Sequence, residues 1–120
     1  MKVLVKNDCT LFGEEKMYLP GAVLEVPSIS DNDAALIHDF ALKRGLDIVA
    51  ASFCRKSEDV EDVRKLLDEK EAGKKVLIYA KIQNLEGLRN FEEILNVADG
   101  IMIDRQSMSM EIEPDKAIVA

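Results

Sequence analysis

The most informative pattern in the chain is an apolar run from Val76 to Ile82 that ends abruptly in polar residues. A continuous apolar run, without alternation, is typical of a parallel strand that is covered on both faces, usually by helices. Lys81, Gln83 and Asn84 stand at its end. Because folds of this kind place their sites at the carboxyl ends of strands, these polar residues are the first candidates for function.

Two other apolar segments are expected to form strands, Leu46 to Phe53 and Gly100 to Ile103. Stretches with apolar residues at helical spacing precede and separate the strands, so the order after residue 30 is helix, strand, helix, strand, helix, strand. Crossovers between parallel strands are short and right-handed. The pattern therefore predicts an α/β fold in which three parallel strands are adjacent and in sequence order, with covering helices packed on the sheet.

The ends of the three helices can be predicted from capping residues. The first helix is expected from about Asp31 to Arg44, with Ser30 as its N-cap and Gly45 as its stop. The second is expected from about Ser57 to Glu71, with Ser57 as its cap, and Asn84 is expected to cap the third. The residues expected on the inner faces are Ile37, Phe40 and Ala41, then Val60, Val63, Leu66 and Leu67, then Leu85, Leu88, Phe91, Ile94 and Leu95.

The amino-terminal stretch has a different pattern. Lys2 to Lys6 and Ala22 to Val26 are expected to form two short strands on either side of a polar loop, without a core of their own. Neither here nor later is there an apolar run with the form of a signal peptide or the length to span a bilayer. The chain is therefore expected in the cytoplasm.

Composition argues against some classes of partner. With 120 residues and an apolar share of 48%, the chain suits one domain that buries a core. A formal net charge of -7, without a basic cluster and with 5% aromatic residues, argues against nucleic acid or an anionic membrane as a partner. A small anionic substrate would need local positive charge, for which Lys81 and Arg105 are the candidates. Cys9 and Cys54 are expected to be reduced thiols, and His38 a surface or boundary residue.

Four long motifs run collinearly over nearly all of the chain: GEEKMYLPG, DIVAASFCRKSEDVEDVRKLL, KIQNLEGLRNFEEIL and DGIMIDRQSMSMEIEPDKAIVA. Together they resemble the pyruvate kinase family. The resemblance implies that residues 1–26 are a remnant of an inserted β domain with the return into the barrel, and that residues 27–120 are a partial TIM (β/α)8 barrel. A closed barrel takes ~250 residues, so this chain is expected to be too short to close one alone.

The resemblance also implies roles for individual residues. Lys81 matches the family's catalytic lysine, which neutralises charge on the transferring phosphoryl group and on the developing enolate. Ser52 and Phe53 match a pair beside the phosphoenolpyruvate pocket. Arg105 matches an arginine with either a substrate contact or a structural salt bridge. Gln106 stands where the backbone amide of a family glycine receives the substrate carboxylate.

Departures from the family pattern are concentrated where its chemistry takes place. Gln83 and Ser107 replace the two carboxylates that bind the catalytic divalent metal, and Mg²⁺ prefers anionic oxygen, so no metal site is expected. Gln106 and Ser109 replace glycines, and their side chains would obstruct the substrate carboxylate. Asp104 replaces an alanine. Because neighbouring residues on a strand point to opposite faces, its carboxylate is expected to compensate only through an irregular turn.

Two classes of function remain open. In the first, the chain is a pyruvate kinase or a truncated copy of one, and the family reaction is phosphate transfer from phosphoenolpyruvate to ADP in glycolysis, giving pyruvate and ATP. In the second, the chain is a non-enzymatic pseudoenzyme fragment that associates with itself or with a full-length subunit. The family's nucleotide and potassium residues would lie before Met1. We therefore expect the chain alone to be inactive and to bind neither Mg²⁺ nor K⁺.

Overall fold

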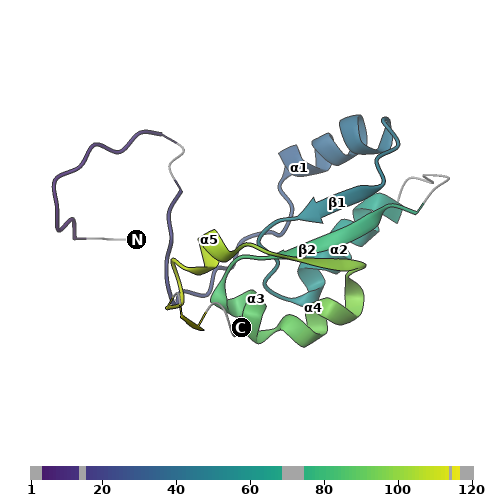
Figure 1. Cartoon of the computed structure of the whole chain (residues 1–120). Helices are drawn as coiled ribbons and strands as arrows, with labels where there is room; N and C mark the ends of the chain where they lie inside the picture. Colours follow the sequence, from purple (N-terminus) through teal and green to yellow (C-terminus); the bar gives the residue numbers. More distant parts are fainter. Residues whose placement is uncertain (1–3, 14–15, 69–74, 114, 117–120) are drawn as a thin grey trace.

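A parallel sheet of three strands forms the centre of the molecule (Figure 1). The computed structural model describes residues 4–13, 16–68, 75–113 and 115–116. The strands are β1 (Ile48–Ala51), β2 (Leu77–Ile82) and β3 (Gly100–Ile103), in the order β1-β2-β3. Both pairs of neighbours are parallel. The predicted α/β class, the strand order and the parallel pairing are therefore confirmed.

Helices precede and separate the strands, as the periodicity predicts. The helical elements are α1 (Asp31–Leu36), the π-helix η1 (Ile37–Leu42), α2 (Ser57–Asp68), α3 (Leu85–Arg89), α4 (Phe91–Val97) and α5 (Arg105–Met108). Ser57 is the first residue of α2 rather than the cap before it. The end predicted near Glu71 lies outside the described residues. Asn84 caps α3 as predicted, since its side chain accepts a hydrogen bond from the Gly87 amide.

The core lies between the sheet and the helices on one of its faces. Helices α2 and α4 pack on each other and on β2. From β2 the core receives Ile78, Ala80 and Ile82, none of which is exposed to solvent. The helices contribute Val60, Val63, Leu67 and Ile94. Leu95 was expected to point inward, but half of it is exposed, because the expected single helix is divided at Asn90 and α4 begins anew at Phe91.

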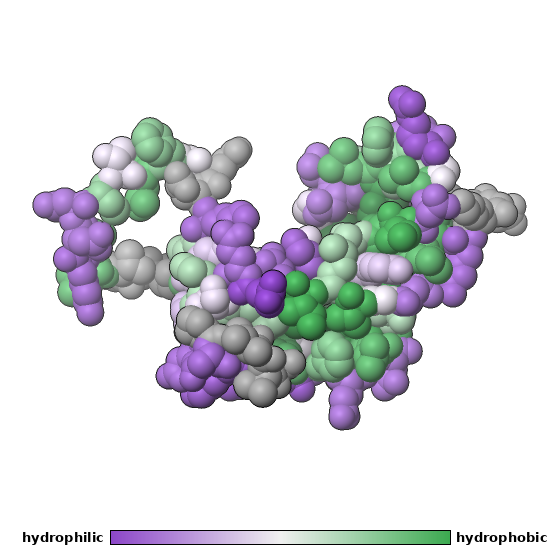
Figure 2. Space-filling model, viewed as in Figure 1, coloured by the Kyte–Doolittle hydropathy of each residue, from purple (hydrophilic) through white to green (hydrophobic). Residues whose placement is uncertain are grey.

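The opposite face of the sheet is open to solvent. Burial alternates along β2, where Leu77, Tyr79 and Lys81 are only partly buried. The expectation of a strand covered on both faces is therefore wrong for this chain, because the described helices cover one side. In a closed barrel, side chains from the other strands fill this space. Figure 2 shows apolar side chains on the surface over the strands, and those that are exposed include Ile48 and Met102.

The first predicted helix is interrupted by a change in helical type. Ser30 and Asp33 form a capping box at the start of α1, and Gly45 has a φ of 64°, as expected of a stop. Between them the chain continues as a π-helix. A wider helical turn changes which residues share a face. Consequently Ala41 is buried, but Phe40, expected inward, is 56% exposed. His38 is half-buried, as expected of a boundary residue.

The two strands expected near the amino terminus are not found. Residues 4–6 and 22–26 have irregular backbone, and the first two residues of the earlier strand lie outside the described part of the chain. Leu4 and Val5 are largely exposed, so no burial offsets the entropy of ordering a strand. Figure 1 shows this segment extending away from the sheet before the chain returns to α1. In the described ranges no helix has both the length and the apolar character to cross a bilayer.

Candidate functional site

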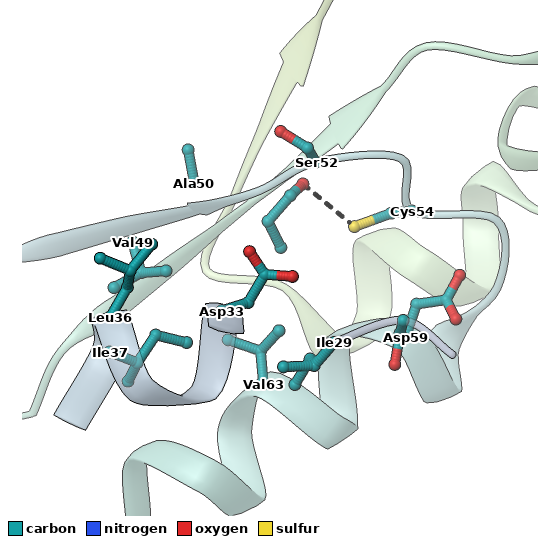
Figure 3. A pocket seen from close by; sticks show the side chains of 12 residues that line it. Ile29, Asp33, Leu36, Ile37, Val49, Ala50, Ser52, Cys54, Asp59 and Val63 are labelled. Carbon is teal, nitrogen blue, oxygen red and sulfur yellow. Dashed lines mark hydrogen bonds between the residues drawn. The ribbon is translucent and has the colours of Figure 1, made fainter. Parts of the chain in front are cut away.

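The carboxyl ends of the strands bring polar residues to one face of the sheet. The register pairs Ala51 with Ala80, and Ile82 with Ile103. Side chains two positions apart share a face, so Lys81 and Gln83 both point to the open side, opposite the core. Ser52 directly follows Ala51, the last residue of β1, and its side chain points to the same open side (Figure 3). Figure 3 shows the side chains of Ala50 and Ser52 directed away from those of the partly buried Val49 and the buried Cys54.

These residues line a cavity of about 390 Å³. Ser52, Phe53, Lys81, Gln83 and Ser107 contribute to its walls, as does a piece of the amino-terminal segment comprising Lys16, Met17 and Tyr18. The structure thus brings together five positions that the resemblance assigned to one site. It also adds the three residues of the amino-terminal segment, for which only the motif GEEKMYLPG gave a signal.

Two of the predicted site residues lie apart from this cavity. Arg105 and Gln106 are exposed in the first turn of α5, and neither lines the cavity. Within the described residues Arg105 has no ion-pair partner. The side chain of Ser109 turns back onto its own helix, where its hydroxyl donates to the Gln106 carbonyl oxygen at 2.8 Å. The conformation of α5 therefore directs Ser107, rather than its neighbours, towards the strand ends.

Asp104 lies at the centre of the polar cluster. Its carboxylate Oδ2 accepts hydrogen bonds from Gln83 Nε2 at 2.9 Å and from Ser107 Oγ at 3.0 Å, and Oδ1 accepts from the Ser107 amide at 3.1 Å. The Lys81 ammonium lies 3.4 Å from Oδ2. Asp104 leaves regular strand geometry, with φ -96° and ψ 89° as the N-cap of α5, and compensation for the lost metal ligands by its carboxylate stays a prediction. In this register Gln83 and Asp104 each follow the last paired residues, Ile82 and Ile103, so they lie level on the same face.

The electrostatics of the cluster depend on this carboxylate. Hydrogen bonds lower the pKa of Asp104 from 3.8 to about 2, the largest contribution coming from the Ser107 amide. Smaller contributions to this lowering of the pKa come from the Ser107 hydroxyl, Lys81 and Gln83, and desolvation opposes them. Asp104 is therefore ionised at neutral pH and supplies a negative charge beside the positive charge of Lys81.

Gln83 connects this cluster to the turn that follows β1. Its Oε1 accepts a hydrogen bond from the Phe53 amide at 2.9 Å. Phe53 has a φ of 58°, a left-handed conformation that is uncommon for residues other than glycine. The next amide, that of Cys54, donates to the Lys81 carbonyl oxygen at 3.3 Å. The side chain of Gln83 therefore bridges the ends of β1 and β3, with a donor on one side and an acceptor on the other.

This arrangement does not fit a divalent cation. Mg²⁺ requires several oxygen ligands, preferably anionic. Here the Gln83 oxygen is already bonded to Phe53, its nitrogen presents hydrogens to the site, and Asp104 is the carboxylate present. Within the described ranges no group of three histidine, cysteine, aspartate or glutamate residues lies together. The Gln83 amide and the Ser107 hydroxyl therefore donate hydrogen bonds at the positions where the family's metal ligands present carboxylate oxygens.

A second cavity, of about 260 Å³, lies between the α1–η1 region, β1 and α2 (Figure 3). Its walls are mainly apolar and include Ile37, Val49 and Val63. The Cys54 thiol donates to the Ala51 carbonyl oxygen at 3.3 Å, and burial raises the pKa of Cys54. Cys9 and Cys54 are both free. A raised pKa keeps this thiol protonated and therefore poorly nucleophilic.

Together the fold and the site define a class. The chain is an open segment of a parallel α/β barrel whose polar cluster lies at the carboxyl ends of the strands, where barrels place their sites. The model of the pyruvate kinase barrel domain matches residues 1–120. The chain belongs to the pyruvate kinase family.

Individual relatives agree with this assignment. A pyruvate kinase of Dictyostelium discoideum is 41% identical over 116 residues, which are 97% of this chain and 22% of the relative. One of Schizosaccharomyces pombe is 38% identical over 120 residues, or 100% of this chain and 23% of the relative. The crystal structure of a pyruvate kinase from Cryptosporidium parvum superposes with a TM-score of 0.81 at 41% identity, covering 85% of this chain and 22% of that one. The chain therefore spans less than a quarter of these relatives.

Proposed function

We propose that this chain carries the lysine side of a phosphoenolpyruvate site of the pyruvate kinase type, and that the site as it stands does not transfer phosphate to ADP. One observation supports the second part most directly. Gln83 occupies a metal-ligand position of the family, and its side-chain nitrogen donates to Asp104 at 2.9 Å. A hydrogen-bond donor thus faces the place where a metal needs an anionic oxygen.

Binding of a small anion is supported by the residues at the cavity. Lys81 and Lys16 both line it, and Ser52 adds a hydroxyl. An ammonium group beside a cavity of this size suits a phosphate or carboxylate group. The family's substrate, phosphoenolpyruvate, carries both groups. Because Lys81 is also paired with Asp104, we expect this binding to be weak.

The family's metal requirement is the reason for expecting impaired chemistry. Charge stabilisation by a bound metal contributes several kcal/mol to such reactions, and each ~1.4 kcal/mol changes the rate tenfold. The positive charge of Lys81 can act on a phosphoryl group, but Asp104 offsets it. We therefore propose that Mg²⁺ and K⁺ are not cofactors of this chain, whereas they are in the family. A cytoplasmic location stays a prediction.

A second candidate function is association with a larger subunit of the same family. The exposed side chains of Ile48 and Met102 on the open face of the sheet favour it, because exposed apolar surface is typical of interaction sites. In this case the site would serve no reaction. The two proposals differ in whether the cavity binds phosphoenolpyruvate.

The experiment is a binding titration followed by NMR on the 120-residue chain. Phosphoenolpyruvate is added first without metal and then with Mn²⁺. The proposal predicts weak, metal-independent shifts at Ser52, Lys81 and Gln83, together with unchanged binding when Mn²⁺ is present. Binding that appears only with Mn²⁺ would show an intact metal-dependent site and contradict the proposal. Without any shift at the cavity, the proposed anion site would be lost, and association would become the better account.

A further inference from the structure

The carboxylate of Asp104 is shared by three side chains from different parts of the sheet edge. Oδ2 lies 2.9 Å from Gln83 Nε2, 3.0 Å from Ser107 Oγ and 3.4 Å from the Lys81 ammonium. Gln83 and Lys81 come from the end of β2, whereas Ser107 belongs to α5. Asp104 itself lies between β3 and α5, where its Oδ1 caps the helix by accepting from the Ser107 amide. One side chain thus links the ends of two strands and a helix.

The polar atoms at the centre of this cluster are used internally. Gln83 is buried, with its oxygen bonded to the Phe53 amide and its nitrogen bonded to Asp104. Ser107 is buried as well, and its hydroxyl donates to Asp104. The side chains of Lys81 and Asp104 are 29% and 21% exposed, so their charges are partly removed from water. A network with satisfied members is rigid, and an incoming ligand has to break a bond to enter it.

We propose that Asp104 is a positioning residue that holds Lys81 and Gln83 in an internally neutralised network, and that this network takes the place of a divalent cation at the ends of β2 and β3. The identification of the site rests on the function proposed above. Two consequences follow from the geometry. Lys81 meets an anionic ligand only in competition with Asp104. In addition, Asp104 already provides one carboxylate next to Gln83, so a second carboxylate at position 83 alone should create a cation site.

The first test removes the charge of Asp104 and keeps its shape. Asp104→Asn retains a side-chain oxygen that can cap α5, since asparagine is as good an N-cap as aspartate. Inorganic phosphate is titrated into this variant and into the unmodified chain, and the Lys81 and Gln83 side-chain signals are followed by NMR. Asp39→Asn is the control, because it makes the same change in net charge at an exposed pair with Lys43.

We expect Asp104→Asn to shift the Gln83 amide and Lys81 side-chain signals and to bind phosphate about fivefold more tightly, the effect of releasing a partly screened ion pair. Asp39→Asn should behave like the unmodified chain. If the Lys81 and Gln83 signals and the phosphate affinity are the same in all three proteins, Asp104 does not hold the network. A fold check by backbone amide spectra distinguishes that outcome from general unfolding.

The second test asks whether Asp104 can contribute to a cation site. Mn²⁺ alone is titrated into Gln83→Glu and into the double variant Gln83→Glu with Asp104→Asn, and paramagnetic broadening of amides near Phe53 and Ser107 is measured. Gln83→Glu should bind Mn²⁺ at least tenfold more tightly than the double variant does. Equal affinities would overturn the role of Asp104. Turnover by the unmodified chain would instead contradict the proposed function and leave these measurements unaffected.

Discussion

The guanidinium of Arg55 lies 3.0 Å from the carboxylate of Asp59, and both side chains are buried at the start of α2. The same guanidinium donates to the carbonyl oxygens of Leu24 and Val26, at 2.8 Å for Val26. Arg55 therefore links the amino-terminal segment to the loop after β1 through these hydrogen bonds. Part of that segment lines the candidate site.

Replacing Arg55 by methionine should destabilise the chain by about 3 kcal/mol, because it leaves the buried Asp59 carboxylate without its cation. The measurement is urea unfolding, read as a lower midpoint with an unchanged slope. Lys43→Met is the matched control, since Lys43 and Asp39 also form an ion pair four residues apart but are exposed. That change should stay within about 0.5 kcal/mol. Equal effects of the two substitutions would show that burial of the Arg55 pair has no energetic consequence.

Gly87 permits the close approach of α3 to the loop after β1. A Cβ atom at this position would lie 2.3 Å from the Cys54 carbonyl oxygen, which as a backbone atom cannot turn aside. Gly87→Ala should therefore lower stability by about 1–3 kcal/mol through overpacking. Gly13→Ala serves as the control, because a Cβ there has no neighbour within 4 Å. Thermal unfolding of both variants gives the comparison, and an unaffected Gly87→Ala would contradict this packing.

The contacts of Asp99 lead us to expect that the protein loses stability in acid. Its carboxylate accepts from the Ile78 amide at 2.9 Å and pairs with Lys75 and Arg64, and the Ile78 hydrogen bond is the main reason that the pKa falls from 3.8 to about 2. A lowered folded-state pKa stabilises the protein above about pH 4, and this stabilisation is lost as the pH falls towards 2.

Solvent screens part of these ion pairs, so we expect Asp99 to contribute about 1 kcal/mol. The free energy of unfolding of Asp99→Asn should be lower than that of the unmodified chain at pH 7. Between pH 5 and pH 2, the range set by the change in the pKa of Asp99, it should fall less steeply. Urea unfolding at each pH measures both proteins. The two proteins should approach each other in stability at the acid end. A constant difference across this range would mean that Asp99 does not titrate as its contacts require.

The open edges and the exposed apolar side chains of the sheet lead us to expect self-association. In the described part of the chain, β1 and β3 each pair on one side only, and their side chains include the exposed Ile48, Met102 and Ile103. Unpaired strand edges and open apolar faces favour contacts with other chains. Sedimentation should therefore show concentration-dependent association in the isolated chain. A monomer that melts sharply and cooperatively at high concentration would count against this prediction.

Much of the fold could be predicted because hydrophobic periodicity reports burial directly. The apolar run before Gln83 and the shorter run from Gly100 to Ile103 gave the strands, and right-handed crossovers fixed their order. Periodicity could not reveal a change of helical type, so Phe40 was assigned to the wrong face. Periodicity also predicted that both faces of β2 are covered, whereas one face is open. An apolar residue that faces the inside of a barrel is the same in the sequence whether or not other strands cover it.

The site was predicted in part for a similar reason. Lys81, Ser52 and Phe53 were found from their places at strand ends and from the family motifs, and they do line one cavity. The contact between Asp104 and Gln83 could not be predicted, because it depends on the register between β2 and β3, and a single sequence does not contain that register. The level pairing of Ile82 with Ile103 is what places Asp104 beside Gln83. The roles of these residues in binding stay predictions.

The most direct test of the central claim is an assay of pyruvate formation by the unmodified chain. Purified free of any full-length kinase, the chain is given phosphoenolpyruvate and ADP with Mg²⁺ or Mn²⁺ and K⁺. Our account predicts no metal-dependent turnover, because Gln83 and Ser107 offer an amide and a hydroxyl where the family has carboxylates and both are engaged with Asp104. Gln83→Glu with Ser107→Asp should gain divalent-metal affinity and still form no pyruvate. Robust metal-dependent pyruvate formation by the unmodified chain would contradict the account.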